Sequence, residues 1–88
     1  MKTSKQLERY FKGASNHRRI DILRLINKSE GLNLGQIAEE LNANIKTISE
    51  HTRRLVHAGL LNKSYRGNEV GHFISPYGKQ FLAFINSF

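Results

Sequence analysis

The chain has 88 residues, no cysteine and a formal net charge of +7 at pH 7. This length corresponds to one domain, residues 1–88, whose small core gains from dimerisation. The lack of cysteine excludes disulfides and thiolate metal sites. No apolar run approaches the roughly 20 residues that span a bilayer, and the N-terminus lacks the apolar core of a secretory signal. We therefore expect a cytoplasmic protein without a membrane segment, whose positive charge favours a polyanionic partner.

Two helices are predicted at the start of the chain, an amphipathic one followed by a largely buried one. In residues 4–14 the apolar positions Leu7, Tyr10, Phe11 and Ala14 repeat at helical spacing. Ser15 or Asn16 is a suitable cap for a second helix over residues 17–28. Three cationic or titratable side chains, His17, Arg18 and Arg19, crowd the first turn of that helix. Positive charge there opposes the helix dipole. The cluster is explained either by contact with phosphate or by screening in water.

Residues 33–61 form the most informative stretch, and their pattern predicts two short helices joined by a tight turn. Asn33 and Gln36 can cap the first helix reciprocally. Its apolar face consists of Leu34, Ile37, Ala38 and Leu41. Asn42 suits the left-handed position at which a chain leaves a helix.

The second helix of this pair is predicted over residues 44–58, with Asn44 as its cap and Gly59 at its end. Its inner face consists of Ile45, Ile48, Thr52, Leu55 and Val56. Its outer face is polar and mostly basic, with Lys46, Glu50, Arg53, Arg54 and His57. This arrangement is typical of a helix-turn-helix. The alternative is a solvated helix face with ordinary Lys46–Glu50 and Glu50–Arg54 pairs.

A β-hairpin is predicted after the helix pair, with strands at residues 61–66 and 72–75 and a glycine-bracketed loop at 67–71. A very short strand is also predicted at residues 32–34, before the helix pair. Lys63, Tyr65 and Arg66 give the hairpin the composition of an arm that lies along a phosphate backbone, although a solvated hairpin would look similar.

A last helix is predicted to start at Ser75-Pro76, because serine caps helices and proline suits the first helical position. This helix and the helix at residues 4–14 each have an apolar, aromatic face. The combined area of the two faces is more than the core of so small a domain can cover. Exposed aromatic area of this size usually marks an interface. We therefore expect a homodimer formed by the first and last helices. Its predicted interface consists of Leu7, Tyr10, Phe11, Phe81, Phe84, Ile85 and Phe88.

The predicted order is helix, helix, short strand, helix, helix, hairpin, helix, which is a mainly α fold with a small β-hairpin (α+β). With this order the chain resembles the ArsR-type winged helix-turn-helix regulators of prokaryotes. The matching segments are residues 7–16, residues 18–23, Gln36-Ile37-Ala38-Glu39-Glu40-Leu41, Thr47-Ile48-Ser49-Glu50-His51 and Ala58-Gly59-Leu60. The resemblance implies a dimeric transcription regulator that binds double-stranded DNA and belongs in the cytoplasm with the nucleoid.

The chain departs from the metal-sensing members of that family. It lacks cysteine, and its last helix has no His, Asp or Glu. Metal sensing is therefore not implied, and we expect neither a metal nor another cofactor. Glu50 stands where a base-reading Gln or Arg is common, so the preferred base sequence cannot be inferred.

The DNA-binding hypothesis assigns two sets of residues. Side chains early in a recognition helix reach base edges in the major groove. The base-facing set is Lys46, Thr47, Ser49, Glu50 and Arg53. Contacts to phosphates add affinity without sequence information. The phosphate set is Arg54, His51, Lys63 and Arg66.

Two of these side chains have a second interpretation, and Tyr65 of the hairpin also allows two roles. Glu50 either accepts a hydrogen bond from a cytosine amino group or orients Lys46 and Arg54. His51 is either a hydrogen-bonded residue at the edge of the core or, when protonated, a phosphate ligand. We expect Tyr65 to pack on the hairpin and not to stack on a base.

Two other functions share this composition: a winged-helix module for protein or RNA contacts, and a chromatin-type DNA binder without sequence preference. An enzyme is not expected. The chain has no paired carboxylates, no Ser/His/Asp constellation and no phosphate-cradling glycine loop.

Overall fold

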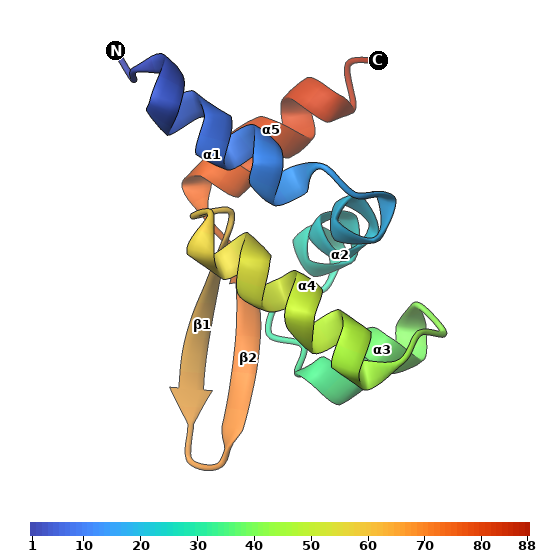
Figure 1. Cartoon of the computed structure of the whole chain (residues 1–88). Coiled ribbons are helices and arrows are strands. Elements are labelled where there is room, and N and C mark those ends of the chain that lie inside the picture. The colour runs from blue at the N-terminus through green and yellow to red at the C-terminus, as the bar shows by residue number, and fades with distance from the viewer.

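The computed structural model describes all residues, 1–88, as five helices and one antiparallel hairpin (Figure 1). The fold is a winged helix-turn-helix, as predicted from the order of elements. The helices α1 and α5 cross at the end of the molecule where both termini lie, and the hairpin extends at the opposite end. The bounds are α1 Ser4–Ala14, α2 His17–Lys28, α3 Leu34–Glu40, α4 Ile45–His57, β1 Leu61–Arg66, β2 Glu69–Ile74 and α5 Pro76–Ile85.

Each helix begins at a side chain that accepts a hydrogen bond from a free backbone N–H. The predicted caps Asn33, Asn44 and Ser75 all have this role, and Asn16, not Ser15, caps α2. The cap of α1 was not predicted: Thr3 forms a reciprocal capping box with Gln6. Local capping therefore explains where all five helices start.

The arginines at the start of α2 hold the carboxyl ends of two other helices. Arg18 donates a hydrogen bond to the carbonyl of Leu41, just after α3, at 3.3 Å. Arg19 donates to the carbonyls of Lys12 and Gly13, in the last turn of α1, at 3.1 and 3.2 Å. A cation is favourable at a helix carboxyl end, where carbonyls lack partners. These contacts explain the basic cluster at the start of α2. Neither of our two interpretations, contact with phosphate or screening in water, included them.

The core is centred on α2, whose Ile22, Leu23 and Ile26 are fully buried. Residues from every other helix and from both strands join this core. On α4 the buried positions are Ile48, Thr52 and Leu55, as predicted. Ile45 was wrongly assigned to the inner face. It is exposed because it is the first residue of α4 and precedes the part of the helix that crosses the core.

The hairpin is longer and tighter than predicted. β2 starts at Glu69, so that only Gly67 and Asn68 separate the strands, and Arg66 pairs with Glu69. Gly67 has φ +60°, the geometry that a two-residue hairpin with glycine in its first position requires. The predicted loop at 67–71 was therefore too long. The strand predicted at 32–34 is a single bridge between Leu32 and His72.

Candidate nucleic-acid interface

The helices α3 and α4 form the helix-turn-helix. Asn42 adopts the left-handed conformation predicted for it, with φ +50°. The N–H of Ala43 donates to the carbonyl of Ala38 at 2.9 Å, which closes the turn. Thr52 is buried but satisfied, because its hydroxyl donates to the carbonyl of Ser49 at 3.0 Å. The buried face of α4 thus fixes the direction of its outer face.

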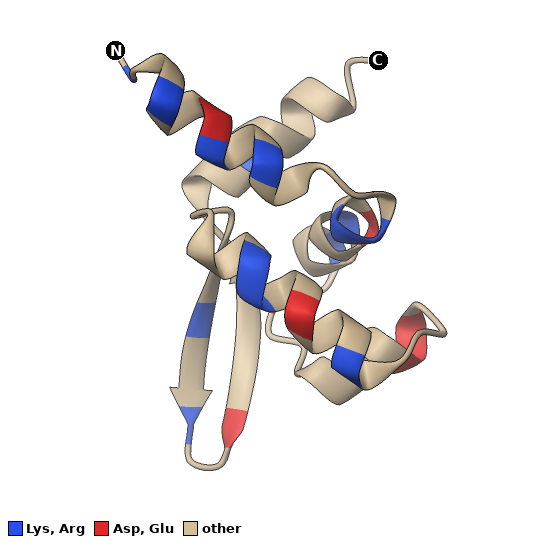
Figure 2. Cartoon of the chain, viewed as in Figure 1, with Lys and Arg blue, Asp and Glu red and all other residues tan.

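All five residues of the predicted base-facing set are exposed and lie on α4. Figure 2 shows bands of basic and acidic residues alternating along this helix. The first turn of α4 contains no acidic residue and presents Lys46 and Thr47 to solvent. The structure therefore brings the predicted set together on one element with no part of the chain covering it.

Glu50 binds the two arginines that follow it on α4. Its Oε1 lies 2.6 Å from Nη2 of Arg53 and 3.0 Å from Nε of Arg54. Arg53 also donates from Nε to Oε2 at 3.3 Å. The hydrogen bond from Arg53 is the main cause that lowers the pKa of Glu50, so the carboxylate is ionised at neutral pH. Of the two partners that our second interpretation gave Glu50, Arg54 is confirmed, whereas Lys46 forms no ion pair with it and Arg53 takes that place.

His51 is held from outside its own helix. Its Nδ1 accepts a hydrogen bond from Nε of Arg19 at 3.2 Å. Burial lowers the pKa of His51, and the nearby charge of Arg19 lowers it further. A neutral ring with an accepting Nδ1 bears its proton on Nε2. This geometry agrees with a hydrogen-bonded histidine at the core edge and leaves Nε2–H as the group that could meet a phosphate.

The hairpin presents Lys63, Tyr65 and Arg66 to solvent. Tyr65 is 71% exposed, so the expectation that it packs on the hairpin was wrong. Its cross-strand partner is Val70, near the tip, where the two strands extend beyond the core. Because side chains alternate along a strand, Lys63 and Tyr65 lie on one face and Arg66 on the other.

His72 lies at the base of the hairpin and is only 1% exposed. Its Nδ1 is 2.8 Å from the carbonyl of Leu32, and its Nε2 has no hydrogen-bond partner. Burial lowers the pKa of His72; the hydrogen bond to Leu32 opposes this shift, and Lys63 adds to it. The ring is therefore a neutral structural link between β2 and the segment before α3.

The tertiary structure adds basic residues that our sequence analysis did not assign to the interface. Arg9 and Lys12 of α1 and Arg19 of α2 lie beside Arg53 and Arg54 of α4. The only signal in the sequence was the unexplained charge at the start of α2. No three His, Cys, Asp or Glu side chains cluster in a way that could hold a metal ion. No helix has the length and apolar character needed to cross a membrane.

Comparison with known proteins gives a family and several structural relatives. The family model of bacterial regulatory proteins of the arsR family matches residues 16–63. No curated protein sequence matches the chain. One similar structure is the homodimeric winged helix-turn-helix DNA-binding domain Mb0332 from Mycobacterium bovis, a possible ArsR-family transcriptional regulator. It is 25% identical, with a TM-score of 0.85, over 94% of this chain and 77% of that one.

Two further structures share the fold. HlyU from Vibrio cholerae has 24% identity and a TM-score of 0.84, over 96% of this chain and 91% of that one. The transcriptional repressor PagR of Bacillus anthracis has 21% identity and a TM-score of 0.83, over 92% and 93%. The family match covers more than half of the chain, and the helix-turn-helix lies inside it. The chain belongs to the ArsR family of bacterial regulatory proteins.

Proposed function

We propose that this protein is a dimeric transcriptional regulator that binds double-stranded DNA. The helix that we predicted at residues 44–58 would lie in the major groove, and the hairpin at residues 61–75 would lie along the backbone. The observation that supports this most directly is the outer face of α4. Lys46, Thr47, Ser49, Glu50 and Arg53 are all exposed there, on a helix whose opposite face is locked into the core.

The base-facing role of these residues follows from the side chains that each base presents. Lysine and arginine donate to guanine, and serine and threonine are compatible with several bases. Glu50 engages Arg53 and Arg54 in the free protein, so its carboxylate would compete with DNA for both guanidinium groups. Arg54, His51, Lys63 and Arg66 would bind phosphates, with His51 donating from Nε2.

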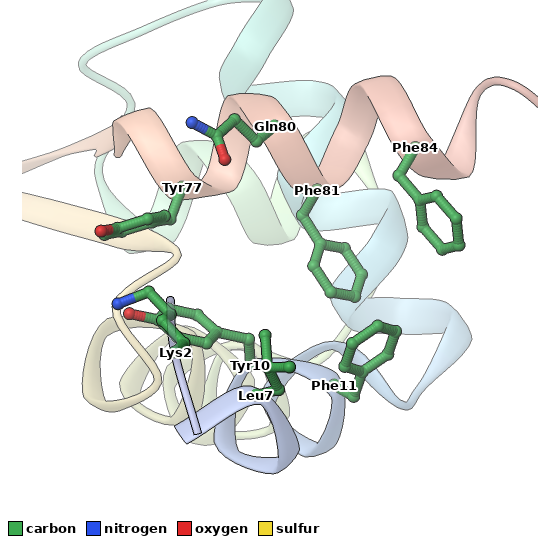
Figure 3. Close-up of a pocket in the computed structure, with 8 residues that line it drawn as sticks. All are labelled: Lys2, Leu7, Tyr10, Phe11, Tyr77, Gln80, Phe81 and Phe84. Carbon is green, nitrogen blue, oxygen red and sulfur yellow. The ribbon is translucent and has the colours of Figure 1, made fainter. Parts of the chain in front are cut away.

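The dimer would form through an apolar surface on α1 and α5. Figure 3 shows Leu7, Tyr10 and Phe11 of α1 directed toward Tyr77, Phe81 and Phe84 of α5. These side chains and their neighbours line a mostly apolar hollow of about 240 Å³. Phe11 packs edge to face on Phe81 and on Phe84, with centroid distances of 5.3 and 6.4 Å.

Much of this surface stays uncovered in a single chain. Phe84 is 50% exposed, and Phe88, which lies beyond the end of α5, is 93% exposed. Leu7 and Phe11 are also exposed, while Phe81 and Ile85 are half-buried. Contiguous exposed aromatic rings favour association. The similar Mb0332 domain is homodimeric, which supports the same assembly here.

Tyr10 is the exception in the predicted dimer interface. It is 9% exposed and belongs to the core of its own chain. Its ring lies 5.2 Å from that of Tyr77, and the ammonium of Lys2 lies over both rings. Tyr10 has little exposed surface that a second copy of the chain could contact. We therefore propose that it packs under the interface residues without contacting the partner.

A test of DNA binding is fluorescence anisotropy with a random-sequence duplex across a salt series. The logarithm of affinity should fall with the logarithm of salt by about 0.9 per phosphate neutralised, a slope near −4 or steeper for a dimer. The variant Lys46→Glu/Arg54→Glu should lose this binding. Its fold should survive, because both residues are exposed and glutamate at position 46, in the first turn of α4, favours the helix dipole and offsets the cost of glutamate at position 54 in the last turn.

The matched control is Lys28→Glu/Lys79→Glu, which makes the same change in net charge at exposed residues of α2 and α5. It should keep most of the affinity. Equal losses in both variants would show that net charge, not α4, governs binding and would overturn the proposed placement.

A single affinity for all duplexes in a site selection would favour a chromatin-type binder. Preference for single strands or RNA would favour the interaction-module alternative. A regulator bound to DNA would reside with the nucleoid in the cytoplasm.

A further inference from the structure

A second hollow lies between α1 and α4, on the side of α4 away from α3. Its volume is about 310 Å³, and only one of its nine lining residues, Ala58, is hydrophobic. Figure 2 shows bands of Lys and Arg both on α1 and on the half of α4 nearest to it. The side chains that matter for its chemistry are Arg9, Lys12, Arg19, Arg53, Arg54 and His57.

The two helices are held at a fixed distance by a glycine contact. Gly13, in the last turn of α1, packs directly on Ala58 at the end of α4, and any side chain on Gly13 would collide with the Cβ of Ala58. Both residues are buried. The hollow is therefore framed by rigid backbone and does not depend on loops.

Arg19 connects these walls. Its Nη1 donates to the carbonyls of Lys12 and Gly13, and its Nε donates to Nδ1 of His51. Its Nη2 donates no hydrogen bond within the chain. The guanidinium is thus fixed in orientation with one nitrogen still free. Burial and the nearby charge of Arg54 both lower the pKa of Arg19, while Glu50 opposes this shift.

Positive charge exceeds negative charge around the hollow. Five Lys or Arg side chains line it, against a single carboxylate, Glu8. Glu8 is only loosely paired with Lys12, at 3.9 Å. Glu50, outside the lining, engages Arg53 and Arg54. Arg9 and Arg19 have no carboxylate partner.

We propose that this hollow is a binding site for a phosphate-type oxyanion. It is distinct from the hairpin, shares Arg53 and Arg54 with the outer face of α4, and adds Arg9, Lys12 and Arg19 to them. Guanidinium groups match phosphate oxygens with pairs of hydrogen bonds, and a lysine adds a point charge. The free Nη2 of Arg19 supplies a preoriented donor, and Arg9 and Lys12 supply charge from α1. The anion is either a backbone phosphate of DNA beyond the helix-turn-helix contacts or the phosphate of a free small molecule.

The test starts without DNA, so its outcome is independent of the proposed function. Pyrophosphate is titrated into the native protein, and amide shifts are followed by ¹H–¹⁵N NMR. Saturable shifts should centre on Lys12, Arg19 and Arg54. In the variant Arg9→Gln/Lys12→Gln the affinity should fall about tenfold, which corresponds to about 1.4 kcal/mol for the lost charged contacts.

Two controls separate a site from general attraction of charge. Lys5→Gln/Lys28→Gln removes the same charge at exposed positions outside the hollow and should leave the affinity within about twofold. Glu8→Gln removes the one lining carboxylate and should strengthen binding. Non-saturable shifts, or equal losses in both double variants, would overturn the proposal.

DNA titrations then identify the source of the anion. If the site takes a backbone phosphate, Arg9→Gln/Lys12→Gln should reduce the salt slope by about one per lost contact per subunit, and pyrophosphate should compete with DNA. If it takes a free molecule, the slope should not change and pyrophosphate should bind the DNA complex as well. Pyrophosphate binding by a protein that failed to bind DNA would support this site and refute the proposed function.

Discussion

Gly13 of α1 and Ala58 at the carboxyl end of α4 pack so closely that a Cβ on Gly13 would overlap that of Ala58. This contact determines how α1 crosses α4. We place α1 in the dimer interface and α4 in the major groove. A small residue at this position is therefore required by tertiary packing, although glycine inside a helix is locally unfavourable.

Gly13→Ala should destabilise the fold by about 1 to 2 kcal/mol. Overpacking a core contact costs about 1–3 kcal/mol, which exceeds the gain of up to about 1 kcal/mol from replacing a helical glycine. Urea unfolding measures the difference. Gly35→Ala in α3 is the matched control, because a Cβ there meets only ordinary contact distances, and it should stabilise the protein slightly. A stabilised Gly13→Ala protein would contradict the close contact.

The stability of the protein should fall as the pH drops below about 6.5, the ordinary pKa of histidine. The pKa values of His72 and His51 are lowered in the folded state. The unfolded chain therefore takes up protons first as the pH falls, and this favours unfolding. The contribution of these two histidines to the free energy of unfolding is therefore complete above pH 6.5. It is lost as the pH falls toward the lower pKa values that they have in the folded protein.

His72→Asn tests the share of this pH dependence that belongs to the hairpin base. The amide nitrogen of asparagine can replace Nδ1 as donor to Leu32 and does not titrate. Urea unfolding at several pH values should show a shallower decline in this variant than in the native protein. An identical pH dependence in the two proteins would remove His72 as its source.

Phe84→Asp should convert the protein to a monomer. A carboxylate at this half-exposed position would have to be desolvated in the proposed interface, next to Phe11 and Phe88. Light scattering should give a mass near the 10.1 kDa of one chain, where the native protein gives about twice this value. Its DNA binding should also weaken, because two linked recognition helices bind more tightly than one.

Tyr65→Asp provides the control for that variant, since Tyr65 is an exposed aromatic residue located on the hairpin, away from α1 and α5. It should remain dimeric. If Phe84→Asp keeps the native mass, the interface does not use the surface of α1 and α5.

Glu50→Gln should strengthen binding to random duplex DNA by roughly threefold to tenfold at low salt, because it removes a negative charge from the face that meets phosphate and frees Arg53 and Arg54. The free energy of unfolding should change by less than about 1 kcal/mol, since ion pairs this exposed contribute little. Anisotropy and urea unfolding measure the two effects. Weaker binding would instead indicate that the carboxylate of Glu50 is needed to order Arg53 and Arg54 for binding.

The order of elements, the caps of α3 to α5, the helix-turn-helix and most of the exposed face of α4 could be predicted from the sequence, which left the cap of α2 open between Ser15 and Asn16. Helical periodicity, caps and turns depend on residues within about four positions of one another, so they can be recognised locally. The resemblance to the ArsR family rested on the same local patterns, and the family match confirmed it.

The contacts of the charged and aromatic side chains follow from the tertiary structure and could not be predicted from the sequence. Arg18 and Arg19 hold the ends of α3 and α1, and Arg19 also holds His51, 32 positions away. Tyr10 belongs to the core, whereas Phe84 remains exposed on the same apolar surface. Long side chains reach partners that the crossing of helices brings near, and that crossing depends on close contacts such as Gly13 against Ala58. No periodicity within one helix contains this information, because each such contact joins segments distant in the chain.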